Sequence, residues 1–172
     1  MRVLYVAAES SDRESVARAL VDEREQFTVV TEGETTAALD AVGTADCVVT
    51  GLDVGEMERF EFLRAVRGES PTVPYVFFAT PDPAGVAGDA LDAGADRYLR
   101  RGGPDQYTRL ASAIETLVAG RRAEREASMF ETLLADVPLG TYVKNRAGEH
   151  VRVSDDHVAQ VREAGLSGPD GD

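Results

Sequence analysis

The sequence predicts an α/β protein with a doubly wound, five-stranded parallel sheet, a long C-terminal helix and a short α+β appendage. First, short apolar runs alternate along the chain with amphipathic stretches of helical period. Second, the connections between them are short, which favours right-handed crossovers and helices on both faces of a parallel sheet. Third, 172 residues with 43% hydrophobic residues suffice for one ordinary domain and an appendage of some tens of residues.

The strand candidates are short runs rich in Val, Tyr and Phe. An uninterrupted apolar run is typical of a strand that helices cover on both faces. Pro74 opens the fourth run, at the first strand position, where a missing N–H is tolerated. The expected strands are Val3–Ala7, Phe27–Val30, Cys47–Thr50, Pro74–Ala79 and Asp96–Leu99.

Each strand candidate is followed by a stretch in which apolar residues recur every three or four positions, the spacing of an amphipathic helix. In the first such stretch, Val16 and Leu20 share one face, with acids and Arg on the other. Gly68 is expected to end the third helix. Asp82 and Pro83 are suitable as the N-cap and first residue of the fourth helix. The expected helices are Ser10–Glu25, Thr35–Val42, Met57–Arg67, Ala84–Ala93 and Pro104 to about Ala135.

The last of these helices changes character after Val118. A buried stripe that includes Ile114 precedes the charged run Arg121–Glu126, and an apolar face resumes at Phe130. Spacings of three and four connect the two apolar parts. The helix over residues 104–135 is therefore expected to be a connector, and it is a candidate for a parallel coiled-coil contact in a homodimer. The alternative is a solvated helix with weak salt bridges.

Charge and composition exclude several classes. Asp and Glu number 31 against 18 Lys and Arg, a net charge of −13, which argues against nucleic-acid binding and against a polybasic membrane anchor. No apolar run reaches the roughly 20 residues of a membrane span, so a cytoplasmic protein is expected. The apolar residues that follow Cys47 predict that its thiol is buried in a strand. Lys144 is the only lysine, and an acidic, Arg-based surface is typical of a salt-rich cytosol, although Arg codons in a GC-rich genome are an alternative.

The common enzyme motifs are missing from the sequence. There is no G-x-G-x-x-G after the first strand and no P-loop, so a nucleotide-binding enzyme is not expected. The serines lack the G-x-S-x-G setting of a hydrolase. His150 and His157 are seven residues apart without further ligands at zinc spacing, so solvated histidines and no metal are expected.

Several segments resemble the receiver domain of response regulators. They are the first strand with its helix, Asp46–Asp53, Glu61–Leu63, Phe77–Thr80 and Asp96–Gly102. The resemblance is in particular to the receiver modules of haloarchaeal sensor proteins. The resemblance covers about residues 1–120 and implies a flavodoxin-like receiver fold. It also implies an acidic pair after the first strand for Mg²⁺, an acceptor Asp after the third, a Thr or Ser after the fourth and a Lys after the fifth.

Most of those positions hold other residues here. The acidic pair falls on Ala7 and Ala8, the acceptor on Gly51 and the Lys on Arg101, whereas Thr80 matches. Phosphoryl transfer to a carboxylate needs a nucleophilic oxygen and a metal that neutralises the developing charge. We therefore expect a pseudo-receiver: a protein-interaction or relay module of a phosphorelay system, with no enzyme activity and no cofactor. The expected partner is a sensor kinase or an adjacent sensory domain.

Other residues leave alternatives open. Asp53, two positions past the acceptor, is a candidate for an atypical phosphoacceptor, and with Glu9 for a weak cation site. The carboxyl edge of the sheet, where the family's acceptor and metal-binding residues are missing, is also a candidate site for a small ligand. Thr80 is explained by capping as well as by a switch role. Tyr98 matches the family's aromatic switch position and serves equally as a fixed interface residue.

The tail resembles the opening of a PAS sensory domain. Bottom-up, Thr141–Val143 and His150–Val153 are two strands around a turn at Asn145–Gly148. The expected organisation is a receiver-like domain over 1–120, a helical linker over 121–136 and a truncated PAS-like segment over 137–172 with a flexible end. Because the later strands of a PAS pocket are missing, the chain is expected to be a fragment of a longer sensor or a truncated gene product.

Overall fold

The computed structural model describes residues 1–80, 85–135, 142–144 and 150–153. The chain divides into two compact units, Met1–Arg121 and Arg122–Asp172, and each is described by itself. The expected turn at Asn145–Gly148 and the expected cap residues Asp82 and Pro83 lie outside the described residues.

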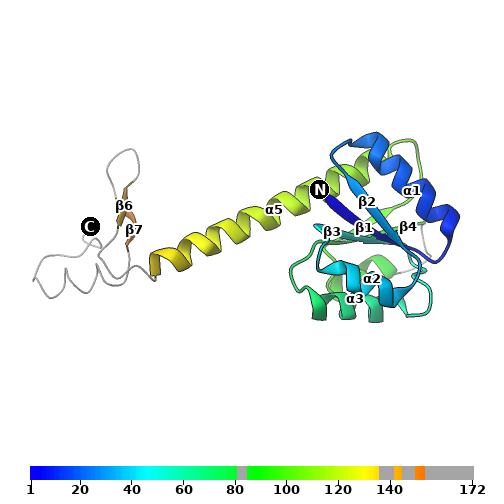
Figure 1. Ribbon diagram of the computed structural model, residues 1–172, viewed down its shortest axis with the longest axis horizontal. Coiled ribbons are helices and arrows are strands. Elements are labelled where there is room, and N and C mark those ends of the chain that lie inside the picture. Colours follow the sequence, from blue (N-terminus) through cyan, green and yellow to red (C-terminus); the bar gives the residue numbers. More distant parts are fainter. Residues whose placement is uncertain (81–84, 136–141, 145–149, 154–172) are drawn as a thin grey trace, which may run out of the picture. The chain divides into compact units, whose positions relative to one another are not determined.

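The first unit contains a five-stranded parallel sheet, which confirms the expected fold class (Figure 1). Its order is β2-β1-β3-β4-β5, so the direction of winding reverses between β1 and β3. Ligands of open α/β sheets bind beside such a switch point, at the carboxyl ends of the strands. The strands are β1 (Arg2–Val6), β2 (Thr28–Glu32), β3 (Cys47–Thr50), β4 (Tyr75–Ala79) and β5 (Arg97–Arg100).

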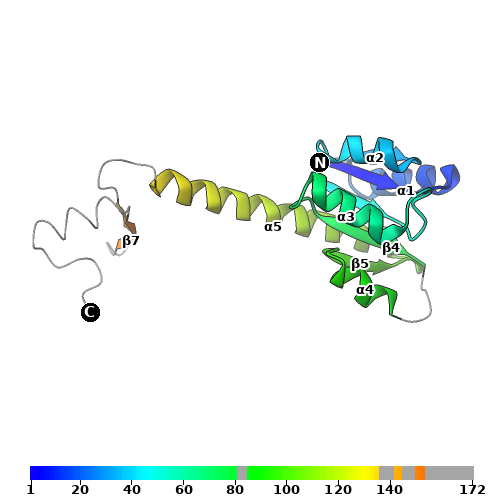
Figure 2. The ribbon, with the colours of Figure 1, turned by 90° about the horizontal axis from the view of Figure 1, so that it is seen from below.

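Helices cover both faces of this sheet (Figures 1 and 2). One core cluster packs α1 and α5 on the sheet, with Val16, Leu20 and Ile114 fully buried. The other packs α2, α3 and α4 on the opposite face, with Phe62 and Ala90 fully buried. The helices are α1 (Ser10–Glu23), α2 (Thr35–Val42), α3 (Arg59–Glu69), α4 (Val86–Asp92) and α5 (Gln106–Ala135).

Some helix ends differ from those expected. Gly68 lies inside α3, which begins after Glu58, whose carboxylate accepts the N–H groups of Phe60 and Glu61 at 2.8 and 3.2 Å. Helix α4 begins at Val86, after Gly85 in a left-handed conformation with φ of 87°. The described part of this helix thus begins after Gly85, because a glycine with positive φ sets the turn into it, and the expected first residue Ala84 lies outside the described residues.

The two halves of α5 use their apolar residues differently. Leu110 and Ile114 have no exposed surface, since the first half completes the core of the first unit. In the second half Met129, Phe130 and Leu133 are 67%, 46% and 57% exposed. The expected buried stripe of the first half is therefore confirmed, whereas these apolar residues of the second half remain exposed.

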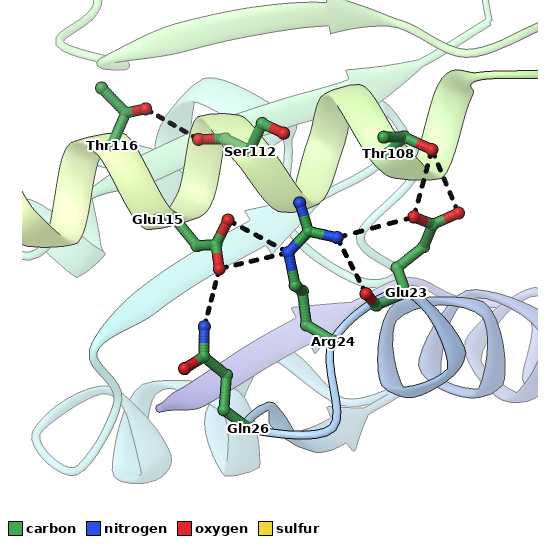
Figure 3. A network of polar contacts seen from close by, with 7 residues as sticks. All are labelled: Glu23, Arg24, Gln26, Thr108, Ser112, Glu115 and Thr116. Carbon is green, nitrogen blue, oxygen red and sulfur yellow. Dashed lines mark hydrogen bonds and ion pairs between the residues drawn. The ribbon is translucent and has the colours of Figure 1, made fainter.

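A polar network attaches the first half of α5 to the end of α1 (Figure 3). The Arg24 Nε donates to both carboxylate oxygens of Glu115 at 3.2 Å, and the Gln26 amide donates to the same carboxylate at 2.6 Å. Nearby, the Thr108 hydroxyl donates to Glu23 at 3.1 Å. These contacts border the apolar stripe of α5 on the α1 side.

The second unit contains a small antiparallel sheet. Strand β6 (Tyr142–Lys144) pairs with β7 (His150–Val153), with Tyr142 opposite Val153. The two expected strands are therefore confirmed, the first over Tyr142–Lys144, while Thr141 lies outside the described residues.

Cys47 makes the stability of the first unit sensitive to alkaline pH. Burial, and then the charges of Asp96 and Asp46, raise the pKa of this fully buried thiol. In the unfolded chain the thiol ionises near pH 8.5. Its contribution to stability is thus complete below about pH 8.5. Above that pH the contribution decreases by about 1.4 kcal/mol per pH unit.

Urea unfolding between about pH 7.5 and 9.5 measures this slope, below the range where tyrosines ionise. Cys47→Ala is expected to have a lower stability throughout and to lack the additional decrease above about pH 8.5. Equal slopes in both proteins would contradict the assignment.

Candidate functional site

A cavity of about 300 Å³ lies at the carboxyl ends of the strands. It brings together all the residues that the sequence assigns to the degenerate pocket. They are Ala7, Ala8, Glu9, Gly51, Asp53, Thr80 and Arg101. Asp12, which the sequence analysis did not single out, lines it as well.

The central position of the cavity has room for a side chain. β3 is fully buried up to Thr50, whose hydroxyl pairs with the Tyr75 hydroxyl at 3.1 Å, and the chain then reaches the edge at Gly51. A Cβ on Gly51 would have no neighbour nearer than 3.9 Å, the amide nitrogen of Asp53. Packing therefore does not demand a glycine here, and the missing acceptor side chain is a chemical difference rather than a steric one.

The residues present do not fit the Mg²⁺ that the receiver resemblance implies. Ala7 and Ala8 have no side-chain oxygen, and their carbonyl oxygens each accept a hydrogen bond from Arg13 Nη1 at 2.7 Å. The Asp53 carboxylate accepts the Gly55 N–H at 3.0 Å. Mg²⁺ prefers at least one or two carboxylates. Across the described ranges, no group of three or more His, Cys, Asp and Glu residues is placed to hold a metal.

Asp12 is the functional-site residue that the sequence reasoning missed. Its carboxylate forms an ion pair with Arg101, and its other oxygen accepts the Tyr5 hydroxyl at 2.6 Å. Burial, and then this bond to Asp12, raise the pKa of Tyr5. Burial tends to lower the pKa of Arg101, yet Asp12 leaves it above its ordinary value. A carboxylate in the first turn of the helix after β1 was the available signal.

Tyr98 lies on β5 and is half-buried among aromatic rings. It packs on Phe77 of β4 with the ring centroids 6.4 Å apart, and Phe77 in turn contacts Tyr75 and Phe60. Thr80, at the end of β4, is exposed beside the cavity. The structure thus places Thr80 at the edge and Tyr98 in a packed position on the neighbouring strand.

Solved structures resemble this arrangement of strands and helices. A response regulator receiver domain protein from Clostridium thermocellum has 19% identity and a TM-score of 0.63, and the match covers 71% of this chain and 97% of that chain. A CheY-like receiver domain protein from Methanospirillum hungatei JF-1 has 18% identity and a TM-score of 0.61, with coverage of 72% and 97%. The first unit has the receiver fold.

A longer protein also matches. NtrX from Brucella abortus, in complex with ADP, has 20% identity and a TM-score of 0.66, and the match covers 95% of this chain and 34% of that chain. No protein-family model and no curated protein sequence matches the chain. At these identities the likeness concerns the receiver fold alone. Among the described helices, none combines the length and the hydropathy that a membrane crossing requires.

Gly33 gives Arg13 the space it occupies at this edge. A Cβ on Gly33 would stand 2.6 Å from Arg13 Nη1, so Gly33→Ala is expected to displace the guanidinium from the Ala7 and Ala8 carbonyls. The expected loss of stability is about 1.5 kcal/mol, the typical value of hydrogen bonds to a charged group at a half-buried site. Urea unfolding measures it.

The double variant separates this displacement from other effects. Arg13→Ala alone is expected to cost about as much as Gly33→Ala, and the two together little more than either, because both remove the same contact. Additive losses would show that Gly33 acts through something other than Arg13.

Proposed function

We propose that the first unit is a pseudo-receiver: a receiver-fold module of two-component signalling that acts through protein contacts and does not accept a phosphoryl group. The observation that carries the proposal is Gly51 at the acceptor position, beside Ala7 and Ala8 where metal ligands are needed. Without a nucleophilic oxygen at the acceptor position and without carboxylates at the two metal-binding positions, the edge lacks the groups that phosphoryl transfer requires there.

Exposure to acetyl phosphate and Mg²⁺, followed by intact mass measurement, tests this proposal. The expected result is no covalent adduct. The alternative is an atypical receiver that uses Asp53, which is exposed at the cavity. A hydroxylamine-sensitive adduct that is lost in Asp53→Asn would establish the alternative and contradict the proposal.

The contact surface that we propose includes β5, the edge strand of the sheet. Arg97 and Arg100 are exposed on it, with the half-buried Tyr98 between them. In a protein of net charge −13, such a basic edge suits an acidic surface of a partner, here a sensor kinase or an adjacent sensory domain. A pull-down with the cognate kinase should weaken in Arg97→Glu/Arg100→Glu, whereas unchanged capture would exclude this edge.

The cavity itself favours a second candidate, a small-ligand-binding receiver-fold domain. Its volume of about 300 Å³ suits a small molecule. A thermal-shift screen of nucleotides, anions and amines tests this, because a ligand at a hundredfold its Kd adds about 2.7 kcal/mol of stability. A ligand whose effect disappears in Gly51→Leu, which fills the cavity, would favour this candidate over the interaction module.

The exposed apolar residues of α5 support a proposed homodimer through the 104–135 helix. Within its second half, Ala123, Ala127 and Phe130 have the spacing of one helix face, and Phe130 is 46% exposed. Light scattering after size-exclusion chromatography should give a dimer mass for the wild type and a monomer mass for Phe130→Glu. Thr132→Glu adds the same charge outside this face and should remain dimeric.

We propose that residues 137–172, after the helical linker, are the opening of a PAS-like sensory segment. The β6–β7 pair supports this, and the resemblance implies that a helix follows at Ser154 or Asp155. NMR chemical shifts of the complete chain should show strand values over 142–144 and 150–153 and helical values after 155. Values of an unstructured chain after 155 would contradict the PAS-like assignment.

We also propose a cytoplasm rich in salt. The support is the net charge of −13, since salt screens the repulsion between carboxylates. The unfolding temperature should therefore rise steadily as KCl increases to about 2 M, where the Debye length falls to about 3 Å or less. A constant or falling unfolding temperature would contradict adaptation to high salt.

A further inference from the structure

The two guanidinium groups nearest the cavity are both bound by the chain itself. Arg13 donates to the carbonyl oxygens of Ala7 and Ala8 at 2.7 Å, as described above. Arg101, at the carboxyl end of β5, forms its ion pair with Asp12. An anion entering the cavity therefore meets two cations whose charges already have partners.

The position of Asp12 is fixed from two sides. One of its oxygens contacts Arg101 and the other accepts the hydroxyl of Tyr5, a side chain with no exposed surface. The side chains of Asp12 and Arg101 are only 20% and 24% exposed, and both line the cavity. A carboxylate held by two donors in a half-buried place already has its hydrogen-bond partners, so it competes effectively with any external anion for Arg101.

The position of Arg101 is fixed as well. Its guanidinium lies over the ring of Phe78, 5.5 Å from the centroid. Tyr107 packs on the same ring, and its hydroxyl oxygen accepts a hydrogen bond from the Arg101 guanidinium. These contacts do not depend on Asp12. A guanidinium has five N–H donors in a planar fork that matches the oxygens of phosphate and similar oxyanions. If Asp12 lost its charge, Arg101 would therefore stay at the cavity with free donors.

We propose that the Arg101 guanidinium is a binding site for inorganic phosphate and that the Asp12 carboxylate blocks it. By pairing with Arg101, Asp12 occupies the position in the cavity that a phosphate oxygen would otherwise take. This inference goes beyond the proposed function because it concerns reversible binding and involves no phosphoryl transfer. It also accounts for how the edge remains ordered without a metal or a phosphoryl group, since Arg13 and Arg101 both have hydrogen-bond partners within the chain.

Phosphate binding to Asp12→Asn tests the proposal. The probe is inorganic phosphate, titrated at a constant ionic strength of about 0.15 M, where the Debye length of about 8 Å weakens the repulsion from the exposed Glu9 and Asp53. The variant should bind phosphate at least about tenfold more tightly than the wild type, and its unfolding temperature should rise by a few degrees at saturation. Asp12→Asn/Arg101→Gln should show no such gain.

The NMR signal of the Arg101 side-chain Nε–H, assigned by its absence from Arg101→Lys, reports the site directly. It should shift on phosphate addition in Asp12→Asn and stay unchanged in the wild type. Asp12→Ser provides a second variant if the amide disturbs the fold. Equal phosphate binding by wild type and both variants, or a gain that survives loss of Arg101, would overturn the proposal. Because no phosphoryl donor is present, either result leaves the test of the pseudo-receiver proposal unaffected.

Discussion

Asp96→Ala is expected to lower the free energy of unfolding of the first unit by about 3 kcal/mol, measured by urea unfolding followed by circular dichroism. The Asp96 carboxylate accepts from Arg67 Nη2 and from the backbone N–H of Tyr75 with one oxygen, both at 2.8 Å. Its other oxygen accepts from Arg121 Nη2, also at 2.8 Å. One side chain thus joins α3, β4 and α5 at the start of β5.

The size of the effect follows from what the alanine leaves behind. The Asp96 side chain is 14% exposed, and its partners Arg67 and Arg121 are 20% and 32% exposed. Removing one partner of a buried pair typically costs 3–5 kcal/mol, because the opposite charge stays desolvated without compensation. Partial exposure of the arginines places the expected value at about the lower end of that range.

Two variants bracket the prediction. Asp96→Asn keeps an acceptor for Tyr75 and loses the charge, so an intermediate loss is expected. Asp40→Ala removes an exposed carboxylate in α2 and should change stability by no more than about 0.5 kcal/mol. If Asp96→Ala behaved like Asp40→Ala, the ion pairs of Asp96 would contribute nothing beyond those of the exposed surface.

The order of strands and helices could be predicted because the strands that helices cover on both faces consist almost entirely of apolar residues. β3 and β4 are buried at every position, and a run such as Tyr75–Ala79 fits no solvated element. Helix ends were harder to predict. Gly68 lies inside α3, at a place where a Cβ would meet nothing within 4 Å. Because neither packing nor backbone geometry requires a glycine there, the sequence alone could not show that the helix continues through Gly68.

The site was predictable only as positions along the chain. Gly51, Ala7 and Arg101 each follow a strand, and parallel strands bring such positions to one edge. The pairs that order this edge depend on side-chain directions that no local pattern contains. Asp12 and Arg101 are far apart in sequence, and the ion pair between them exists because both residues line the cavity at this edge of the sheet.

Ile114→Ala should have an effect of similar size, a loss of about 3 kcal/mol of unfolding free energy. Ile114 has no exposed surface and lies in the core cluster that joins α1, α5 and the sheet. Its truncation removes apolar contacts and leaves a cavity that a helix fixed on both sides cannot close. The fixing contacts are the Arg24–Glu115 network on the α1 side and the Asp96–Arg121 pair.

A neighbouring residue on the same helix supplies the control. Thr116 is exposed, and its hydroxyl donates to the Ser112 carbonyl oxygen one turn earlier at 2.8 Å (Figure 3). Thr116→Ala exchanges this local bond for a better helix former and should leave stability within about 0.5 kcal/mol of the wild type. Equal, small effects at both positions would mean that the first half of α5 is not part of the folded core. The helix would then be a separable linker from its first turn, and β1, β3 and β4 would need another cover for their apolar face.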